Sequence, residues 1–236
     1  IAISSTVPYE AGFGSSGALS VSLATAILEM LDQPRNHERI WALANRFEEL
    51  FHGTPSGIDT GLSTFGGCQA FANARPGGLP ERHSLPLPPV SILYGTVPRQ
   101  TSTRELVASV HRRLAEQRSS TESLLQELGR IASAAIETIK QTESGSMADR
   151  LGDLANKAQQ ALVELGLGSA LLDRLGGLMP TLGACGYKLS GAGGGGAFYA
   201  IFPNNRQAIN ALPAVKEFLS NQAISDYHLH TLETPG

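Results

Sequence analysis

The sequence predicts an α+β protein with two lobes, and the order of its local patterns is the reason. One strand-like segment and two helical segments are followed by short strand-like runs up to about residue 97. Helical periodicity then extends over residues 103–179, and a strand–helix–strand pattern follows it. Grouped strands and helices without regular βαβ alternation are typical of α+β folds. We expect one lobe at residues 1–90 and a second at residues 91–236.

The first lobe begins with a strand in this interpretation. Residues 1–7 alternate weakly and include β-branched side chains, which predicts a strand that ends at the following proline. Apolar residues at helical spacing from Leu19 to Leu31 predict a helix. Asn36 is placed to cap a second helix, which Gly53 and Pro55 would end.

The remaining elements follow from the same periodicities. Short runs punctuated by proline and glycine predict strands at residues 68–72, 84–87 and 90–97. Four apolar stripes predict four helices, marked by Leu106–Leu114, Leu124–Ile139, Leu151–Leu162 and Leu171–Leu178. The chain then reads as a strand at 197–202, a helix at 206–220 and a strand at 226–232.

Composition excludes several classes of function. Hydrophobic residues make up 42% and charged residues 17%, as in an ordinary globular protein. A net charge of −3 gives no general attraction to nucleic acid or to anionic membranes. Cys68 and Cys185 lie far apart, outside metal-site or disulfide spacings, and no run resembles a signal peptide or a membrane span. We therefore expect a cytoplasmic protein without a nucleic-acid or membrane partner, and the sequence leaves a homodimer open.

A first glycine-rich loop, Gly12 to Gly17, lies between the predicted strand and the first predicted helix. Glycine lets backbone approach a ligand closely, and the free N–H groups of a helix start attract anions, so this loop suits a phosphate. Ser15 and Ser16 add hydroxyls that can bind phosphate oxygens or a metal ion. A tight turn with a serine cap accounts for the same residues, and the loop alone does not decide between the two.

Two glycine loops match the G-x-G-x-x-G pattern of dinucleotide-binding proteins, and neither has the required context. After the first loop, Asp32 lies at the right distance for a ribose contact, but a second helix follows it instead of a strand. The second loop, Gly191 to Gly196, is followed by a strand instead of a helix. Its five glycines in six residues still indicate that some other group approaches the backbone closely.

A third segment contains two carboxylates that can divide metal binding and proton abstraction between them. Glu48 lies near the end of the second predicted helix, and Asp59 follows the run His52-Gly-Thr-Pro-Ser-Gly-Ile. Each residue also has a simpler interpretation. Glu48 can be a solvated helix residue, Asp59 a turn or capping residue, and His52 a structural histidine.

These segments together resemble the GHMP kinase superfamily. Pro8-x-x-Ala-Gly-Phe-Gly-Ser-Ser16 is similar to its second motif, with Phe13 in place of the usual leucine, and Lys188-Leu-Ser-Gly-Ala-Gly-Gly-Gly-Gly196 is similar to its third. Glu48-x-x-x-His-Gly-Thr-Pro-Ser-Gly-Ile-Asp59, followed by Ser63-Thr-Phe-Gly-Gly67, resembles the mevalonate kinase branch. So does Val97-Pro-Arg-Gln-Thr101.

The resemblance implies a fold and a set of roles. The fold would pair a ribosomal-S5-domain-2-like N-terminal lobe, here incomplete, with a ferredoxin-like α+β C-terminal lobe. ATP and Mg²⁺ would be the cofactors, with Ser16 and Glu48 on the metal, Asp59 as catalytic base, and Arg99 and Thr101 beside the substrate. The nucleotide would contact Gly12, Gly14, Ser15, Ser16, Gly17, Gly191, Gly193 and Gly194.

The reaction implied is phosphorylation of mevalonate to 5-phosphomevalonate in isoprenoid biosynthesis. Phosphomevalonate, a sugar or homoserine are alternative acceptors within the superfamily, and a non-catalytic nucleotide-binding relative is another alternative. The superfamily's first motif and its catalytic lysine have no counterpart here. The four lysines are Lys140, Lys157, Lys188 and Lys216, and none has that place. We therefore expect an N-terminal segment to be missing, and little activity from this chain alone.

Overall fold

A computed structural model of the protein describes residues 2–7, 12–52, 55–73, 78–99, 101–141 and 147–234, without the side chains of residues 51 and 52. The chain divides into two compact units, Ile1–Pro86 and Leu87–Gly236. No helix in the described ranges has the length and apolar character needed to cross a lipid bilayer.

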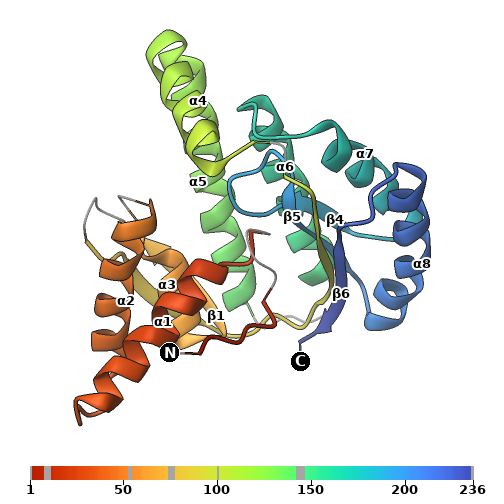
Figure 1. The fold of residues 1–236 in the computed structure, drawn as a ribbon. Coiled ribbons are helices and arrows are strands. Elements are labelled where there is room, and N and C mark those ends of the chain that lie inside the picture. The colour runs from red at the N-terminus through yellow and green to blue at the C-terminus, as the bar shows by residue number, and fades with distance from the viewer. Residues whose placement is uncertain are drawn as a thin grey trace. The chain divides into compact units, whose positions relative to one another are not determined.

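Within its described residues, the first unit contains three helices and a hairpin (Figure 1). Their bounds are α1 Ser15–Met30, α2 His37–His52, α3 Ile58–Phe65, β1 Cys68–Ala72 and β2 Glu81–Leu85. Its core lies between α1 and α2 and includes Ala24, Leu28, Ile40 and Ala44. The predicted cap of the second helix is confirmed, because the Asn36 side-chain oxygen accepts a hydrogen bond from the Arg39 backbone N–H at 2.9 Å.

One expectation and one alternative for the first unit are wrong, and one predicted strand has different bounds. Residues 2–7 form no strand and are exposed, because no neighbouring strand in the described residues pairs with them. Asp59 lies in a helix instead of a turn, since Gly57 adopts a left-handed conformation and starts α3. The strand expected at 84–87 runs over Glu81–Leu85, opposite β1 in antiparallel register.

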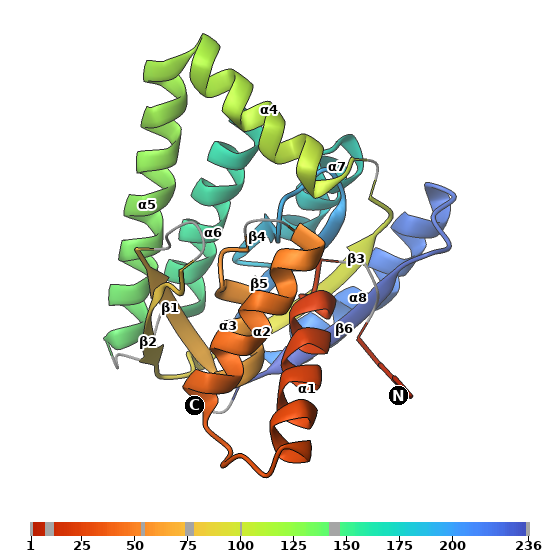
Figure 2. The same ribbon diagram turned by 60° about the vertical axis from the view of Figure 1, so that its left-hand side comes forward.

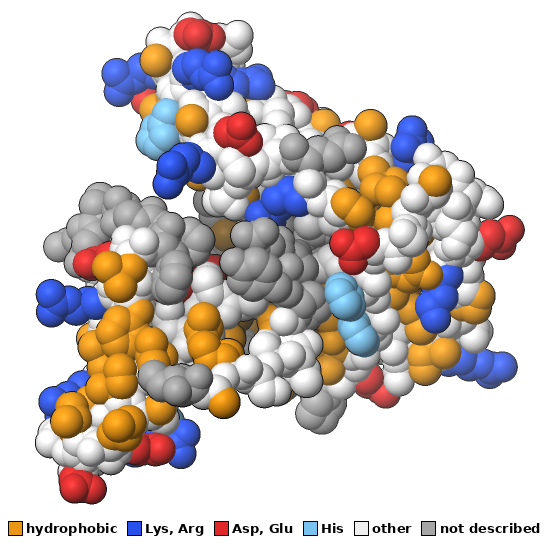
Figure 3. Space-filling model, viewed as in Figure 1, with side chains coloured by type: hydrophobic (Ala, Val, Ile, Leu, Met, Phe, Trp, Pro, Cys, Tyr) orange, Lys and Arg blue, Asp and Glu red, His pale blue; other side chains and the backbone are white. Residues whose placement is uncertain are grey.

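Apolar side chains surround α1 on more than one side. Ala24 and Leu28 are buried against α2, whereas Met30 is 83% exposed and the following Leu31 is 63% exposed. Figure 3 shows hydrophobic side chains gathered over this part of the first unit. Met30 and Leu31 are thus exposed apolar residues at the C-terminal end of α1.

The second unit is a four-stranded antiparallel sheet with helices on both faces (Figures 1 and 2). The strands are β3 Ser91–Val97, β4 Gly186–Leu189, β5 Gly196–Phe202 and β6 His228–Glu233, in the order β4-β5-β3-β6. The helices are α4 Thr103–Glu116, α5 Arg118–Lys140, α6 Met147–Glu164, α7 Ala170–Leu178 and α8 Asn205–Asn221. The four helices expected between residues 103 and 179 are therefore confirmed, whereas β4 was not predicted.

Alternation along β5 explains why both faces are covered. Phe198, Ala200 and Phe202 are buried in a core shared with α7 and α8. Tyr199 and Ile201 point to the opposite face, where they pack with residues of α5 and α6. A strand that is buried on both faces reads as a continuous apolar run, as this one does.

The outer edge of the sheet is closed by α6 side chains. β4 is an edge strand, and the Asn156 and Gln159 side-chain oxygens accept hydrogen bonds from the backbone N–H groups of Tyr187 and Leu189, at 2.9 Å and 2.8 Å. Gly152 and Gly186 let the two backbones approach closely, because a side chain at Gly186 would overlap Gly152 of α6, and one at Gly152 would overlap Cys185, the residue before β4. Satisfied edge groups do not pair with other chains.

Candidate active site

The first glycine loop forms the N-terminus of α1. Gly14 is the residue before the helix, with φ of 66°, and as a glycine it has no side chain with which to cap the helix. The alternative of a serine cap is therefore wrong, since Ser15 is already the first helical residue. The N–H groups of a first helical turn have no partner within the helix and carry partial positive charge. This helix end is chemically suited to an anion.

Glu48 reaches α1 from the end of α2. Its side chain is only 4% exposed, and its two oxygens accept hydrogen bonds from the Ser16 hydroxyl at 3.1 Å and the Ser20 hydroxyl at 2.8 Å. The alternative of a solvated helix residue is therefore wrong. Ser20 was not predicted, although its position one turn after Ser16 places both hydroxyls on one helix face.

Asp59 lies in the first turn of α3, directly against the start of α1. A β-carbon added at Gly14 would lie 3.7 Å from the Asp59 Cβ and Cγ atoms and 3.8 Å from its Oδ1 atom. One added at Gly17 would lie only 3.0 Å from Asp59 Cβ. The glycines therefore let the N-terminal turns of two helices approach, and the Asp59 side chain lies beside the α1 helix end.

The oxygen atoms gathered here fit a magnesium ion better than a softer metal. Carboxylate and hydroxyl oxygens are hard ligands, and Mg²⁺ is commonly held by one or two carboxylates together with substrate phosphates. No group of three or more His, Cys, Asp or Glu side chains that could hold a metal occurs among the described residues. The site thus suits a cation that arrives with a phosphate ligand. The His52 side chain lies outside the described residues.

The second glycine loop is filled by the protein's own chain. A side chain at Gly193 would overlap the Leu167 carbonyl, and one at Gly195 would lie 2.5 Å from the Pro98 carbonyl oxygen. All four residues from Gly193 to Gly196 have positive φ, between 66° and 106°. The sequence predicted that some group approaches the backbone of this loop closely. In this structure that group is the backbone of neighbouring segments, at Leu167 and Pro98.

Arg99 and Thr101 lie beside this second loop. A β-carbon at Gly196 would lie 2.9 Å from Arg99 Nη2, and one at Gly194 would lie 3.2 Å from Thr101 Cβ. Arg99 donates a hydrogen bond to the Thr103 hydroxyl at 3.0 Å, while its buried Nε has no hydrogen-bond partner among the described residues. The predicted site residues therefore form two clusters, one in each compact unit.

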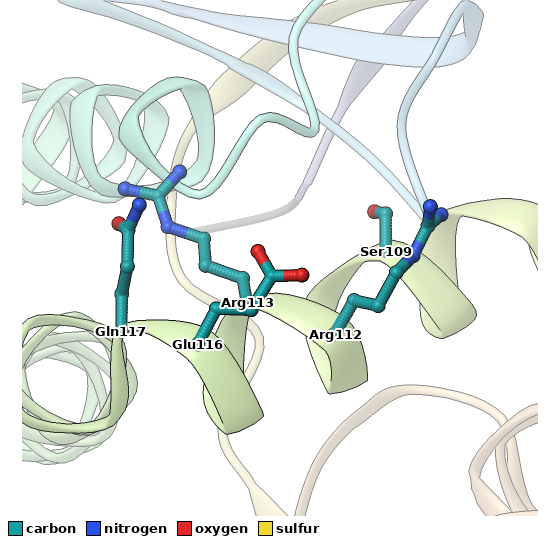
Figure 4. A pocket seen from close by; sticks show the side chains of 5 residues that line it. All are labelled: Ser109, Arg112, Arg113, Glu116 and Gln117. Carbon is teal, nitrogen blue, oxygen red and sulfur yellow. The ribbon is translucent and has the colours of Figure 1, made fainter.

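A separate hollow on α4 contains none of the predicted residues (Figure 4). It has a volume of about 410 Å³ and is lined by Ser109, Arg112, Arg113, Glu116 and Gln117. All five side chains come from one helix and the residue that follows it, so the hollow is the polar side of an exposed helix.

The fold and the glycine loops define a class of kinase. Residues 1–67 match the family of GHMP kinases N terminal domains, and residues 122–221 match the family of GHMP kinases C terminal domains. The chain belongs to the GHMP kinase superfamily and has its α+β fold. The resemblance inferred from the motifs is confirmed.

Individual relatives include mevalonate kinases and a homoserine kinase. A mevalonate kinase of Pyrococcus abyssi is 34% identical over 210 residues, which are 89% of this chain and 61% of the relative. The structure of L. major mevalonate kinase in complex with R-mevalonate matches 94% of this chain and 66% of its own, with a TM-score of 0.77 and 24% identity. Homoserine kinase from Cytophaga hutchinsonii matches 98% of this chain and 68% of its own, at a TM-score of 0.73 and 17% identity. The fold is thus common to kinases named for different acceptors, and this chain spans about three fifths of the curated relative's length.

Proposed function

We propose that this protein catalyses the ATP-dependent phosphorylation of a hydroxyl on a small metabolite, with mevalonate as acceptor and 5-phosphomevalonate as product. The observation that carries the proposal is the meeting of Ser16, Glu48 and Asp59 at the starts of α1 and α3. This arrangement combines an anion-binding helix end, oxygen ligands for a cation and a second carboxylate. Phosphoryl transfer needs mainly positioning and charge neutralisation from a protein.

The first cluster has the nucleotide and metal roles in this proposal. Bound ATP with Mg²⁺ supplies the phosphoryl group and neutralises its charge. The Ser16 hydroxyl and the Glu48 carboxylate hold the cation, and Ser20 keeps that carboxylate in place by its hydrogen bond. The backbone N–H groups at the start of α1 bind phosphate oxygens. Gly191, Gly193 and Gly194 border the nucleotide in this proposal. The close approach of neighbouring backbone already accounts for glycine at position 193.

Asp59 acts as the general base. Its carboxylate accepts the proton of the acceptor hydroxyl while the new oxygen–phosphorus bond forms and the bond to the ADP oxygen breaks. A carboxylate is also stabilising in the first turn of a helix, where Asp59 lies. General bases typically contribute about 10²–10⁴-fold to a rate.

Arg99 and Thr101 are the residues that we propose for acceptor binding. Mevalonate carries a carboxylate, and an arginine guanidinium binds carboxylates through paired N–H donors. Arg99 uses Nη1 for Thr103, and its buried Nε is still without an acceptor among the described residues. The relatives named for mevalonate support the same acceptor.

The proposal is tested by ADP release with the full-length product of the gene that encodes this chain. Mevalonate, phosphomevalonate, galactose and homoserine are compared, and we expect turnover with mevalonate to exceed the others. Glu48→Gln should abolish most of that turnover. Glu49→Gln is the matched control, because Glu49 is the neighbouring carboxylate and is exposed. Nucleotide binding without transfer to any acceptor would contradict the proposal.

A further inference from the structure

Trp41 is tied to the helix that carries Asp59. It is the only tryptophan of the chain and is 3% exposed on α2. Its indole N–H donates a hydrogen bond to the Gly57 carbonyl at 2.8 Å. The ring also packs edge-on against Phe65 and Phe71, with centroid distances of 5.5 Å and 6.2 Å. The tryptophan therefore contacts α3 through packing and through one directional bond.

The Gly57 carbonyl, which accepts this bond, belongs to the residue before α3. Gly57 precedes the helix with φ of 76°, and its carbonyl also accepts the first helical hydrogen bond from the Gly61 N–H at 2.9 Å. The Thr60 hydroxyl donates to the same oxygen at 3.3 Å. Because the carbonyl already has helical partners, the indole bond is not needed to satisfy it. The additional bond fixes the direction of the peptide unit two residues before Asp59.

Close packing surrounds α3 on the side of the indole ring and on the side of α1. A β-carbon at Gly61 would lie 3.0 Å from Trp41 Nε1, and one at Gly17 would lie 3.0 Å from Asp59 Cβ. A methyl group would therefore be crowded at either position, so the backbone of α1 packs closely on α3 and that of α3 on the indole ring. Asp59 thus lies between the N-terminus of α1 and the start of α3, where the Trp41 indole donates its hydrogen bond to Gly57.

We infer that Trp41 is a positioning residue, whose indole N–H sets the location of the Asp59 carboxylate through the Gly57 carbonyl. The inference rests on the proposed role of Asp59. A displacement of about 1 Å in a catalytic group can cost about 10²-fold in rate, so loss of this bond should act on turnover more than on nucleotide binding.

Trp41→Phe tests this, because it removes the donor and keeps an aromatic ring. We expect kcat to fall by about 10–100-fold, with KM for ATP changed by less than about threefold. Replacement of Trp41 by benzothienylalanine, in which sulfur replaces the ring N–H, should give the same loss with packing preserved. Phe71→Leu is the control, since Phe71 packs on the indole without contacting the Gly57 carbonyl through a hydrogen bond. It should lower Tm and leave kcat within about threefold.

A double-mutant cycle with Asp59→Asn distinguishes positioning from a general structural role. If Trp41 acts through Asp59, Trp41→Phe costs little further rate in the Asp59→Asn protein. Equal losses in both backgrounds, or an unchanged kcat in the benzothienylalanine protein, would overturn the inference and leave the proposed function standing. Absence of phosphoryl transfer in the unsubstituted protein would refute both, and is recognised before any variant is made.

Discussion

The glycine loops at residues 12–17 and 191–196 have similar sequences and different surroundings. A β-carbon at Gly14 would meet Asp59 at 3.7 Å, which is an ordinary van der Waals separation. A β-carbon at Gly195 would lie 2.5 Å from the Pro98 carbonyl oxygen and 2.9 Å from Arg99 Cα. Only the backbone conformation requires glycine at the first position, whereas both conformation and space require it at the second. A glycine-rich pattern therefore does not distinguish a position with space beside it, such as Gly14, from one filled by neighbouring backbone, such as Gly195.

The largest expected effect is a loss of turnover on substitution of Asp59, beside the first loop. Asp59→Asn should lower kcat by about 10²–10⁴-fold, because an amide cannot accept the acceptor's proton. ATP affinity, measured by isothermal titration calorimetry, should change by less than about threefold. A rate loss below about tenfold in a folded variant would show that Asp59 is not the base.

The contrast between the loops predicts opposite outcomes for two alanine substitutions. Gly195→Ala forces a side chain into occupied space at φ of 106°, so it should lower the free energy of unfolding by about 3 kcal/mol. Gly14→Ala meets only conformational strain, which costs about 1–2 kcal/mol. Thermal unfolding of both variants checks this, and equal losses would remove the distinction between the loops.

Lys188, just before the second loop, should make stability depend on pH. Burial lowers its pKa, and its amine donates to the Leu189 carbonyl at 2.8 Å. The folded state therefore disfavours the charged amine, at a cost that is complete below the folded pKa and disappears as pH rises past the unfolded value of about 10.4. Lys188→Met should raise Tm by a few degrees at pH 7, and the gain should shrink toward pH 10.5. A gain independent of pH would contradict this.

The smallest expected effect comes from a glycine with open space around it. Gly129 lies within α5 and is exposed, and a β-carbon there would meet nothing within 4 Å. Gly129→Ala should therefore stabilise the protein by about 0.5–1 kcal/mol. Gly17→Ala, also within a helix, should instead lower kcat because its β-carbon would press on Asp59. Thermal unfolding and kcat are measured for both variants. They test whether helix propensity or the contact with Asp59 determines the effect of an alanine.

Periodicity predicted the long helices and several strands, and it missed some of the shortest elements. The helices from α4 to α7 were predicted because each repeats its apolar residues over several turns. Three short elements were missed: α3, with eight residues, β4, with four, and the 3-10 helix η2 at Met179–Leu182, with four. Segments of that length contain too few repeats to separate helix, strand and turn. The strand expected at residues 1–7 was wrong because alternation says nothing about whether a partner strand is present.

The sequence by itself determined the superfamily and the residues of the candidate site. Spaced motifs identified the superfamily, and Ser16, Glu48, Asp59 and Arg99 were predicted because each stands at a fixed place within one of those motifs. The hydrogen bonds from Ser20 to Glu48 and from Trp41 to the Gly57 carbonyl were found only in the tertiary structure. A motif reports which groups are present along the chain. A hydrogen bond between residues 16 or more positions apart depends instead on how whole helices pack, and no local pattern records that.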